Sequence, residues 1–280
     1  METNIFTIPK ELLPQVSTKY PFLYLEHGRM EIDDRSVKFI NAEGNVISIP
    51  CGMINAILLG TGTSITHDAI KILSEYNCHV FWVGEDGLKF YAHGLVPTNH
   101  TKNFQIQMEC ACDKQKSLDI ARKMFTKRFD NIDISNKTLT QLRGMEGARV
   151  KEQYKQFANQ FGVKWSYRDA HINEFENQSV TNQYLTMFNQ YLYAILCSAT
   201  LSLGFSPHIG FIHKSSPLPF IYDMADLYKK DLCIFSAFEL TKIGFDKETA
   251  SYEFAKRAKK MNLLKIFVDD IKMLFGEYMK

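Results

Sequence analysis

The sequence of 280 residues lacks both a cysteine pair at zinc-binding spacing and a long uninterrupted apolar run. None of its six cysteines forms a Cys-x-x-Cys pair, so we expect no structural zinc site. The longest nearly apolar run, residues 192–205, is too short and too interrupted by serine and threonine to cross a membrane. The N-terminus has no basic region followed by an apolar core. We therefore expect no signal peptide and a reducing, cytoplasmic compartment.

Glycine-rich nucleotide-binding motifs are also missing. The segment LLGTGTS carries Gly60 and Gly62, but no Gly-Lys-Ser/Thr follows, and the third glycine of a dinucleotide-binding motif is absent. We interpret this segment as a turn that connects a strand to a helix.

What the sequence does contain is the composition of a globular protein, with 45% apolar and 23% charged residues and a net charge of only +2. The charge is unevenly distributed. Residues 1–100 carry 7 Lys and Arg against 11 Asp and Glu, and the rest of the chain carries 26 against 20. A basic C-terminal part beside an acidic N-terminal part is typical of a protein that holds DNA with one part and partners with the other.

The residue pattern predicts an α+β fold, in which a small N-terminal β-rich domain precedes a larger all-α catalytic domain. Short alternating and apolar segments separated by turn residues dominate up to residue 94, with hairpins expected around residues 41–44 and 84–87. One helix is expected there, at residues 66–76. After a linker at residues 95–103 the apolar spacing becomes helical. We expect domains at 1–94 and 104–280, with helices over residues 103–112, 117–129, 140–160, 182–203, 237–242 and 251–275.

The most informative stretch is residues 204–230, GFSPHIGFIHKSSPLPFIYDMADLYKK. A helix entered at Pro219 places Asp223 and Asp226 three residues apart on one face, beside apolar residues. His213 precedes this helix in an irregular segment that is free to fold back toward it. Buried carboxylates need a partner, and two carboxylates with an imidazole suit a divalent cation of the Mg²⁺ or Mn²⁺ kind.

A second unusual feature is the string LRGMEGARV, in which Gly144 and Gly147 flank Glu146 inside a helical pattern. Each glycine costs about 1 kcal/mol relative to alanine, so we expect a backbone, a ligand or a metal to approach closely there. Arg149 lies near enough in sequence to pair with Glu146, or to hold a phosphate beside the metal. From pattern alone, plainer interpretations stay open: an exposed glutamate, two surface aspartates and a hydrogen-bonded core histidine.

Two further features have two interpretations each. The outer side of the 117–129 helix carries a basic stripe, which is either a solvated face or a phosphate-binding surface; its members are Arg122, Lys123, Lys127 and Arg128. The polar connection at residues 161–179 carries aromatic residues that either stack on unpaired bases or anchor the loop; these are Trp165, Tyr167 and Phe175. Gln183 and Tyr193 are polar exceptions in an apolar helix and are candidates to reach the site.

The motifs LRGMEGARV, GFIH and PFIYDMADLYK, in this order and spacing, resemble the CRISPR adaptation integrase family, Cas1. The segment VFWVGEDGLKFYAHG is similar to the N-terminal domain of that family, and the resemblance looks closest to the type I-E branch. It implies that Glu146, His213 and Asp226 are catalytic residues and ligands of Mg²⁺ or Mn²⁺. It implies a further functional role for Asp223, which we assign to orienting His213 or a metal-bound water.

The resemblance also implies the activity and the partners. The expected reaction joins the 3′-hydroxyl ends of short foreign duplex DNA (spacers) to the leader-proximal repeat of a CRISPR array by transesterification. The expected partners are double-stranded DNA, a second copy of the chain in a homodimer that pairs through the N-terminal domain, and the small companion protein Cas2 in a heterohexamer. Basic residues expected to contact DNA are Arg143, Arg149, Lys214, Lys256, Arg257, Lys259 and Lys260. The alternatives are a stand-alone metal-dependent nuclease acting on branched or single-stranded DNA, and a catalytically silent DNA-binding scaffold.

Overall fold

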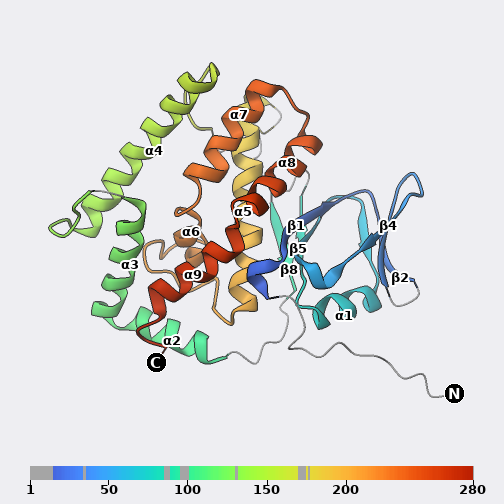
Figure 1. Cartoon of the computed structure of the whole chain (residues 1–280), viewed down its shortest axis with the longest axis horizontal. Helices are drawn as coiled ribbons and strands as arrows, with labels where there is room; N and C mark the ends of the chain where they lie inside the picture. The colour runs from blue at the N-terminus through green and yellow to red at the C-terminus, as the bar shows by residue number, and fades with distance from the viewer. Residues whose placement is uncertain are drawn as a thin grey trace.

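The computed structural model describes residues 15–33, 36–84, 89–94, 101–129, 132–169, 175 and 177–279. Strands dominate the first part of the chain and helices the second, and the two parts lie side by side (Figure 1). This arrangement confirms the predicted α+β class. In the described part of the chain, no helix is both long and apolar enough to cross a membrane.

The strands form two four-stranded sheets. The first sheet has the order β1-β5-β7-β8, with β8 antiparallel to β7 and the other neighbours parallel. Its strands are β1 (Tyr20–Leu25), β5 (Ile54–Leu59), β7 (His79–Val83) and β8 (Phe90–His93). The second sheet has the order β4-β3-β2-β6, in which only the β2 and β6 pair is parallel. Its strands are β2 (Gly28–Asp33), β3 (Ser36–Asn41), β4 (Val46–Ile49) and β6 (Thr63–Ile65).

The strands of both predicted hairpins pair as expected. β3 and β4 pair across residues 41–46 as expected, and β7 pairs with β8, although residues 85–88 of that turn lie outside the described residues. Strands β1 and β2 belong to different sheets, and between them His27 has a positive φ of 51°, which redirects the chain. A Cβ at Gly28 would lie 2.5 Å from the Ile40 carbonyl oxygen, so this crossing needs glycine.

The strand-to-helix interpretation of LLGTGTS is wrong in one respect. A short strand, β6, lies between β5 and the helix and pairs with β2. The helix itself, α1 (His67–Glu75), begins after Thr66, whose side chain accepts a hydrogen bond from the Ala69 amide. Three residues are too few for a hydrophobic period to reveal a strand.

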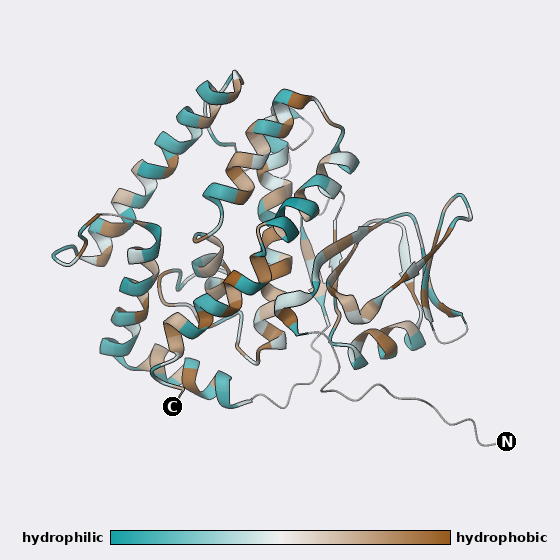
Figure 2. Ribbon diagram, viewed as in Figure 1, coloured by the Kyte–Doolittle hydropathy of each residue, from teal (hydrophilic) through white to brown (hydrophobic). Residues whose placement is uncertain are grey.

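Strand β5 is buried along its whole length, which is why its sequence INAILL is apolar except for Asn55, whose side-chain amide donates to the carbonyls of Pro21 and Ile195. Ala56 and Leu58 belong to the large core that the helices form, whereas Ile57 and Leu59 face the second sheet and α1. Apolar segments therefore continue from the helices through the sheets (Figure 2). The β-rich part is thus one wall of the helical core.

Helix α5 (Val180–Ser202) is the centre of the helical part and packs on β5, α6 and α7. The remaining helices are α2 (Thr101–Cys112), α3 (Lys114–Arg128), α4 (Leu139–Phe161), α6 (Pro219–Ala225), α7 (Phe235–Ile243), α8 (Lys247–Lys260) and α9 (Leu263–Phe275). A π-helical turn, η6 (Lys230–Ile234), leads into α7. The single helical stretch expected at 251–275 is divided into α8 and α9, because Asn262 adopts a left-handed conformation with φ 56°. Residues 95–100 of the expected linker lie outside the described residues, and its last three residues begin α2.

Candidate active site

The segment between α5 and α6 is irregular but held at several points. The buried side-chain amide of Gln107 on α2 donates to the carbonyls of Ser206 and Ile209, both at 2.9 Å, and accepts from the Ser206 amide at 2.7 Å. A Cβ at Gly210 would lie 2.7 Å from both the His213 carbonyl oxygen and Pro219, so only glycine allows this close approach. Pro219 is the first residue of α6, as predicted, where its missing N–H costs nothing. The loop is therefore fixed in front of α6.

Asp223, on α6, organises the end of this loop. Its side chain is fully buried and accepts hydrogen bonds from the backbone amides of Phe211 at 2.6 Å, Ile212 at 3.0 Å and His213 at 2.8 Å. The same carboxylate accepts a hydrogen bond from the ring nitrogen Nδ1 of His213 at 2.7 Å. Four donors satisfy the buried charge, so Asp223 determines both the path of the loop and the orientation of the His213 ring.

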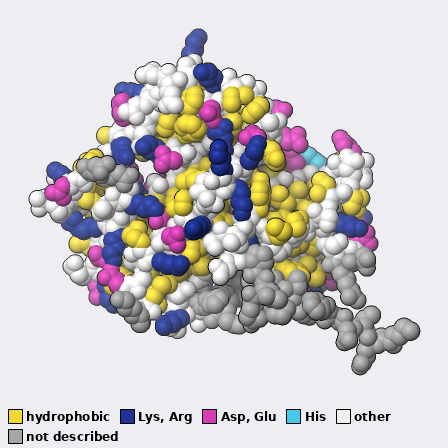
Figure 3. Space-filling view, viewed as in Figure 1, with side chains coloured by type: hydrophobic (Ala, Val, Ile, Leu, Met, Phe, Trp, Pro, Cys, Tyr) yellow, Lys and Arg dark blue, Asp and Glu magenta, His cyan; other side chains and the backbone are white. Residues whose placement is uncertain are grey.

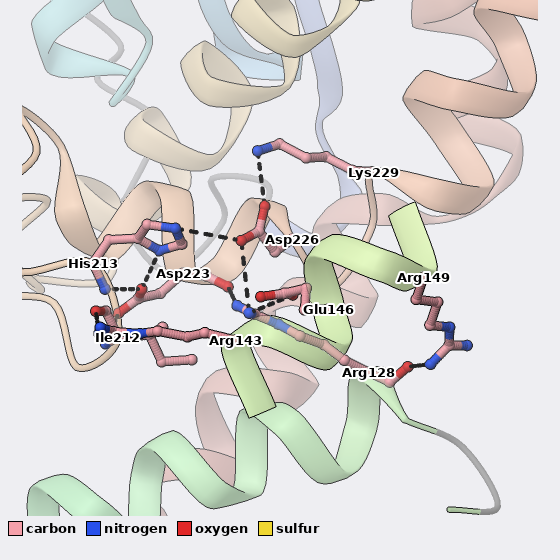
Figure 4. A network of polar contacts seen from close by, with 9 residues as sticks. All are labelled: Arg128, Arg143, Glu146, Arg149, Ile212, His213, Asp223, Asp226 and Lys229. Carbon is pink, nitrogen blue, oxygen red and sulfur yellow. Dashed lines mark hydrogen bonds and ion pairs between the residues drawn. The ribbon is translucent and has the colours of Figure 1, made fainter. Parts of the chain in front are cut away.

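This contact also fixes the chemistry of His213. Asp223 accepts three backbone N–H groups and acts as an acceptor, so we assign the proton of this contact to Nδ1, which leaves Nε2 as the nitrogen directed elsewhere. Nε2 lies 3.7 Å from Asp226 Oδ2, and the ring is about one third exposed, with the His213 side chain at 35%. Figure 4 shows Nε2 directed toward Asp226 and away from Asp223. His213 thus offers one free nitrogen, suited to a metal ion or a proton.

Asp226 lies one turn farther along, at the C-terminal end of α6. Its Oδ1 accepts a hydrogen bond from Lys229 Nζ at 2.8 Å, and its Oδ2 faces Arg128 and His213. Burial alone would raise the pKa of Asp226, but the Lys229 ammonium and the Arg128 guanidinium outweigh it and hold this pKa below its ordinary value. Asp226 is therefore ionised at neutral pH. Lys229 also lies over the Tyr193 ring, 5.0 Å from its centroid, so Tyr193 reaches the site through this lysine.

Glu146 approaches from the opposite side, on α4. Its Oε1 accepts a hydrogen bond from Arg128 Nη1 at 2.7 Å, and the same nitrogen lies 3.6 Å from Asp226 Oδ2. Burial raises the pKa of Glu146 above its ordinary value; Asp226 adds to this, and Arg128 opposes it. The structure thus brings all four predicted residues, Glu146, His213, Asp223 and Asp226, into one network (Figure 4).

This network lies in a cleft of about 1050 Å³. Its lining includes Glu146, His213 and Asp226 together with basic residues, among them Arg143, Arg149 and Lys214. On the face shown in Figure 3, lysine and arginine side chains gather over the helical part and are sparse over the β-rich part. A cleft of this size with a basic lining suits a polyanionic ligand.

The donor types fit a divalent cation, because Glu146 and Asp226 supply carboxylate oxygens and His213 supplies a free imidazole nitrogen. The side chains as they stand are not closed around one ion. Within the described residues, no group of three His, Cys, Asp or Glu side chains is arranged to hold a metal. The guanidinium of Arg128 lies between the two carboxylates instead.

The predicted DNA-contacting residues separate into two groups. Arg143, Arg149 and Lys214 border the cleft, although the Arg143 guanidinium already binds the Ile212 carbonyl. The other group lies on α8, outside the cleft lining, and consists of Lys256, Arg257, Lys259 and Lys260.

Three of the residues on α8 are engaged within the chain. Arg257 pairs with Glu239 at 2.5 Å, Lys256 pairs with Glu253, and Lys259 donates to the Thr18 carbonyl at 2.8 Å. The cluster on α8 therefore does not extend the cleft.

For two features of α4, one of the predicted alternatives is wrong: the pair between Arg149 and Glu146, and the approach of another backbone to the two glycines. Arg149 does not pair with Glu146; its guanidinium binds the Arg128 carbonyl and lies over the Phe129 ring. No described atom outside the helix backbone lies within 4 Å of a Cβ built at Gly144 or Gly147, so neither glycine is needed for an internal close approach. Both face open space, and Gly147 borders the cleft.

The basic stripe predicted on α3 is also divided. Lys123 pairs with Asp119 and Glu277, Lys127 pairs with Asp270, and Arg122 donates to carbonyls of residues 134, 135 and 137. These three side chains hold the helix to its neighbours. The fourth, Arg128, is not on the outer side: only 4% of its side chain is exposed, and it reaches into the site.

The aromatic residues of the 161–179 connection mostly anchor the loop. Trp165 packs against Tyr154 and Phe238, and Phe175 is buried, whereas Tyr167 is exposed. Residues 170–174 and 176 lie outside the described residues. Gln183 does not reach the site, because its side chain donates to the Phe175 and Gln178 carbonyls.

Sequence reasoning missed three functional positions: Arg128, Lys229 and Gln107. A signal for Arg128 was present, because it follows the inward-facing Met124 and Phe125 by four and three residues and so shares their face. Lys229 follows Asp226 by three residues and is placed to pair with it. Nothing local marks Gln107, whose partners lie about one hundred residues away.

Two carboxylates, a histidine nitrogen and a basic lining in one cleft suit a site that processes phosphate esters. The chain belongs to the Cas1 family of CRISPR-associated proteins, whose family model, CRISPR associated protein Cas1, matches residues 23–135 and 134–266. One relative is the CRISPR-associated endonuclease Cas1 2 of Chlorobaculum tepidum, which is 47% identical over 98% of this chain and 93% of its own length. Another is the CRISPR-associated endonuclease Cas1 of Escherichia coli K12, which is 32% identical over 84% of this chain and 77% of its own length. Among solved structures, a TtCas1–DNA complex is similar, with a TM-score of 0.81, 31% identity and 91% coverage of each chain.

Proposed function

We propose that this protein is a divalent-metal-dependent DNA integrase of CRISPR adaptation, which joins the 3′-hydroxyl ends of short duplex DNA to the leader-proximal repeat of a CRISPR array. The observation that carries the proposal is the convergence of Glu146, His213 and Asp226 at the wall of one basic-lined cleft. The endonuclease names of the curated relatives and the DNA in the TtCas1 complex support it.

The proposed reaction is a transesterification. The oxygen of the incoming 3′-hydroxyl forms a bond to a phosphorus of the target strand, the bond from that phosphorus to the target's own 3′ oxygen breaks, and the proton lost by the attacking hydroxyl ends on the leaving oxygen. One phosphodiester replaces another, so no ATP is required. With water as the nucleophile, the same site would cut the strand.

Each residue of the site has a distinct task in this proposal. Glu146, His213 and Asp226 would hold the metal, Mg²⁺ or Mn²⁺, which would offset the negative charge that develops on the phosphoryl oxygens. Asp223 orients His213 so that Nε2 faces the cleft, where it is a ligand or a proton carrier. Arg143, Arg149 and Lys214 line the path of the DNA backbone and make binding dependent on salt.

We further propose that the protein acts as a homodimer with Cas2 in a heterohexamer, since joining both strands at a fixed spacing needs two sites. Its placement in the type I-E branch stays a prediction.

The test is a joining assay on a supercoiled plasmid that carries a leader and a repeat. Labelled duplex with free 3′ ends is incubated with the protein, Cas2 and Mg²⁺ or Mn²⁺, with and without EDTA. His213→Ala and Asp226→Ala should lower joining at least about 100-fold. His208→Ala is the matched control, because this exposed histidine of the same loop lies outside the cleft lining.

Each outcome separates the candidate functions. Label joined to the plasmid, and lost in both site variants and in EDTA, supports the integrase. Shortened strands without joining indicate a nuclease. DNA that is bound but chemically unchanged under every metal indicates a scaffold.

A further inference from the structure

The last residue of α3, Arg128, faces inward, although the sequence pattern placed it on the outer side of the helix. Arg128 is buried, with 4% of its side chain exposed, and its guanidinium lies over the Phe125 ring at 5.2 Å from the centroid. Its Nη2 donates to the Asp223 backbone carbonyl at 2.6 Å, which ties it to α6. Its Nε has no hydrogen-bond partner in the described part of the chain. A buried donor left unpaired is costly, so this position is not optimised for stability alone.

The remaining nitrogen, Nη1, lies between the two carboxylates of the site. It is 2.7 Å from Glu146 Oε1 and 3.6 Å from Asp226 Oδ2, and Figure 4 shows it entering the space that those two side chains face. Two partly buried carboxylates on different helices repel each other, and a cation between them removes that repulsion. In the protein without metal, Arg128 is that cation.

Other charged groups near the site do not take this place. Lys229 occupies the opposite oxygen of Asp226, Oδ1, and His213 approaches Oδ2 from the side of the loop. Arg143 and Arg149 bind backbone carbonyls of Ile212 and Arg128 and point away from the carboxylates in Figure 4. Arg128 is therefore the one arginine of the described site that bridges Glu146 and Asp226.

A metal ion held by the same oxygens needs the same space. A divalent ion and the Arg128 guanidinium cannot both lie between Glu146 Oε1 and Asp226 Oδ2, because two positive charges a few ångströms apart repel each other in a partly buried site. This is consistent with the finding that no described group of three acidic, histidine or cysteine side chains closes around one ion.

We propose that Arg128 is a positioning residue that acts as the resident counter-cation of the site, keeping Glu146 and Asp226 together until a divalent cation displaces its Nη1. The anchor of Nη2 on Asp223 and the contact with Phe125 stay in place, so only one end of the guanidinium has to move. Arg128 then sets the threshold of metal concentration at which the site is loaded. This inference rests on the metal site of the proposed function.

The first measurement is Mn²⁺ binding to the full chain, followed by the electron paramagnetic resonance signal of free Mn²⁺. Arg128→Met removes the competing charge and should tighten Mn²⁺ binding about tenfold or more. Arg128→Lys keeps a positive charge on a shorter side chain, so its Mn²⁺ affinity should lie between those of Arg128→Met and the wild type. Arg29→Met is the control, because it removes an exposed arginine of β2 that lies outside the cleft lining, and Mn²⁺ affinity should stay within about twofold.

The second measurement does not depend on metal. In EDTA, Arg128→Met should lower the melting temperature, because it leaves two carboxylates facing each other. Adding Glu146→Gln should restore most of that loss, since the pair to be neutralised is gone. This double variant also serves if Arg128→Met alone fails to fold.

The outcomes are distinct. Unchanged or weaker Mn²⁺ binding by Arg128→Met and Arg128→Lys, with normal binding by the wild type, overturns the counter-cation role and leaves the proposed function standing. The counter-cation role is also overturned if Arg128→Met lowers the melting temperature by the same amount in the wild-type background and in the Glu146→Gln background. Absence of Mn²⁺ binding in the wild type and in every variant refutes the metal site itself, and displacement with it.

Discussion

Replacing Asp223 tests how the loop before α6 is built, because one buried carboxylate supports three backbone amides and a ring nitrogen. In Asp223→Ala, the N–H groups of Phe211 and Ile212 lose their acceptor inside the protein, and that of His213 loses its acceptor in a half-buried position. A buried donor without a partner costs about 1–3 kcal/mol, so we expect a loss of about 3–6 kcal/mol in the free energy of unfolding. Such a loss is comparable to the whole stability of many domains.

Asp223→Asn keeps the shape but replaces one oxygen by an NH₂ group. Each oxygen of Asp223 accepts two hydrogen bonds, so in either orientation of the amide two donors face another donor. We expect this variant to fold but to lose about 2–4 kcal/mol of its free energy of unfolding, and the His213 ring to lose its fixed orientation. Strand joining should fall about 10–100-fold, as for partners that orient a metal ligand.

Urea unfolding followed by circular dichroism measures the first effect, and hydrogen exchange of the Phe211 and Ile212 amides shows whether the loop has opened. Asp231→Asn is the control, since this carboxylate lies in η6, is 67% exposed, and should change stability by less than about 0.5 kcal/mol. An Asp223→Ala protein that unfolds within about 1 kcal/mol of the wild type, with protected amides, would refute the argument.

Three further predictions follow from the same structure. Burial lowers the pKa of His79 to about 3, far below its ordinary value of 6.5, so the unfolded chain takes up a proton at a pH where the folded protein does not. The contribution of His79 to the free energy of unfolding is therefore fully present above pH 6.5 and falls by about 2 kcal/mol between pH 7 and 5. Urea titrations at both pH values measure this loss, which should be absent in His79→Gln. Gly144→Ala and Gly147→Ala should each stabilise α4 by about 0.5–1 kcal/mol, because both positions are open. Only Gly147 borders the cleft, so only Gly147→Ala should lower strand joining. Equal joining by the two variants would show that the glycine at the cleft has no role. Lys229→Met removes the ammonium that depresses the pKa of Asp226, so the acid limb of the pH–rate profile should move to higher pH, and an unmoved limb would show that this contact does not control Asp226.

The sequence determined the elements and much of the chemistry, because those depend on local pattern. The short buried strand INAILL, the hairpin strands and the helix entered at Pro219 follow from period, turn residues and the fixed φ of proline. Motif spacing and family resemblance together named Glu146, His213, Asp223 and Asp226, and the structure brings all four into one network.

Only the tertiary structure decided how these groups are held, because that depends on residues far apart in the chain. The pattern placed Arg128 in a surface stripe and allowed Arg149 to pair with Glu146. Packing of α3 against α4 and α6 instead placed Arg128 between the carboxylates and directed Arg149 to the Arg128 carbonyl. Gln107 fixes a loop about one hundred residues away, a contact without any local signal. Helical period tells which residues share a face, but which face meets which neighbour is settled only when the whole core packs.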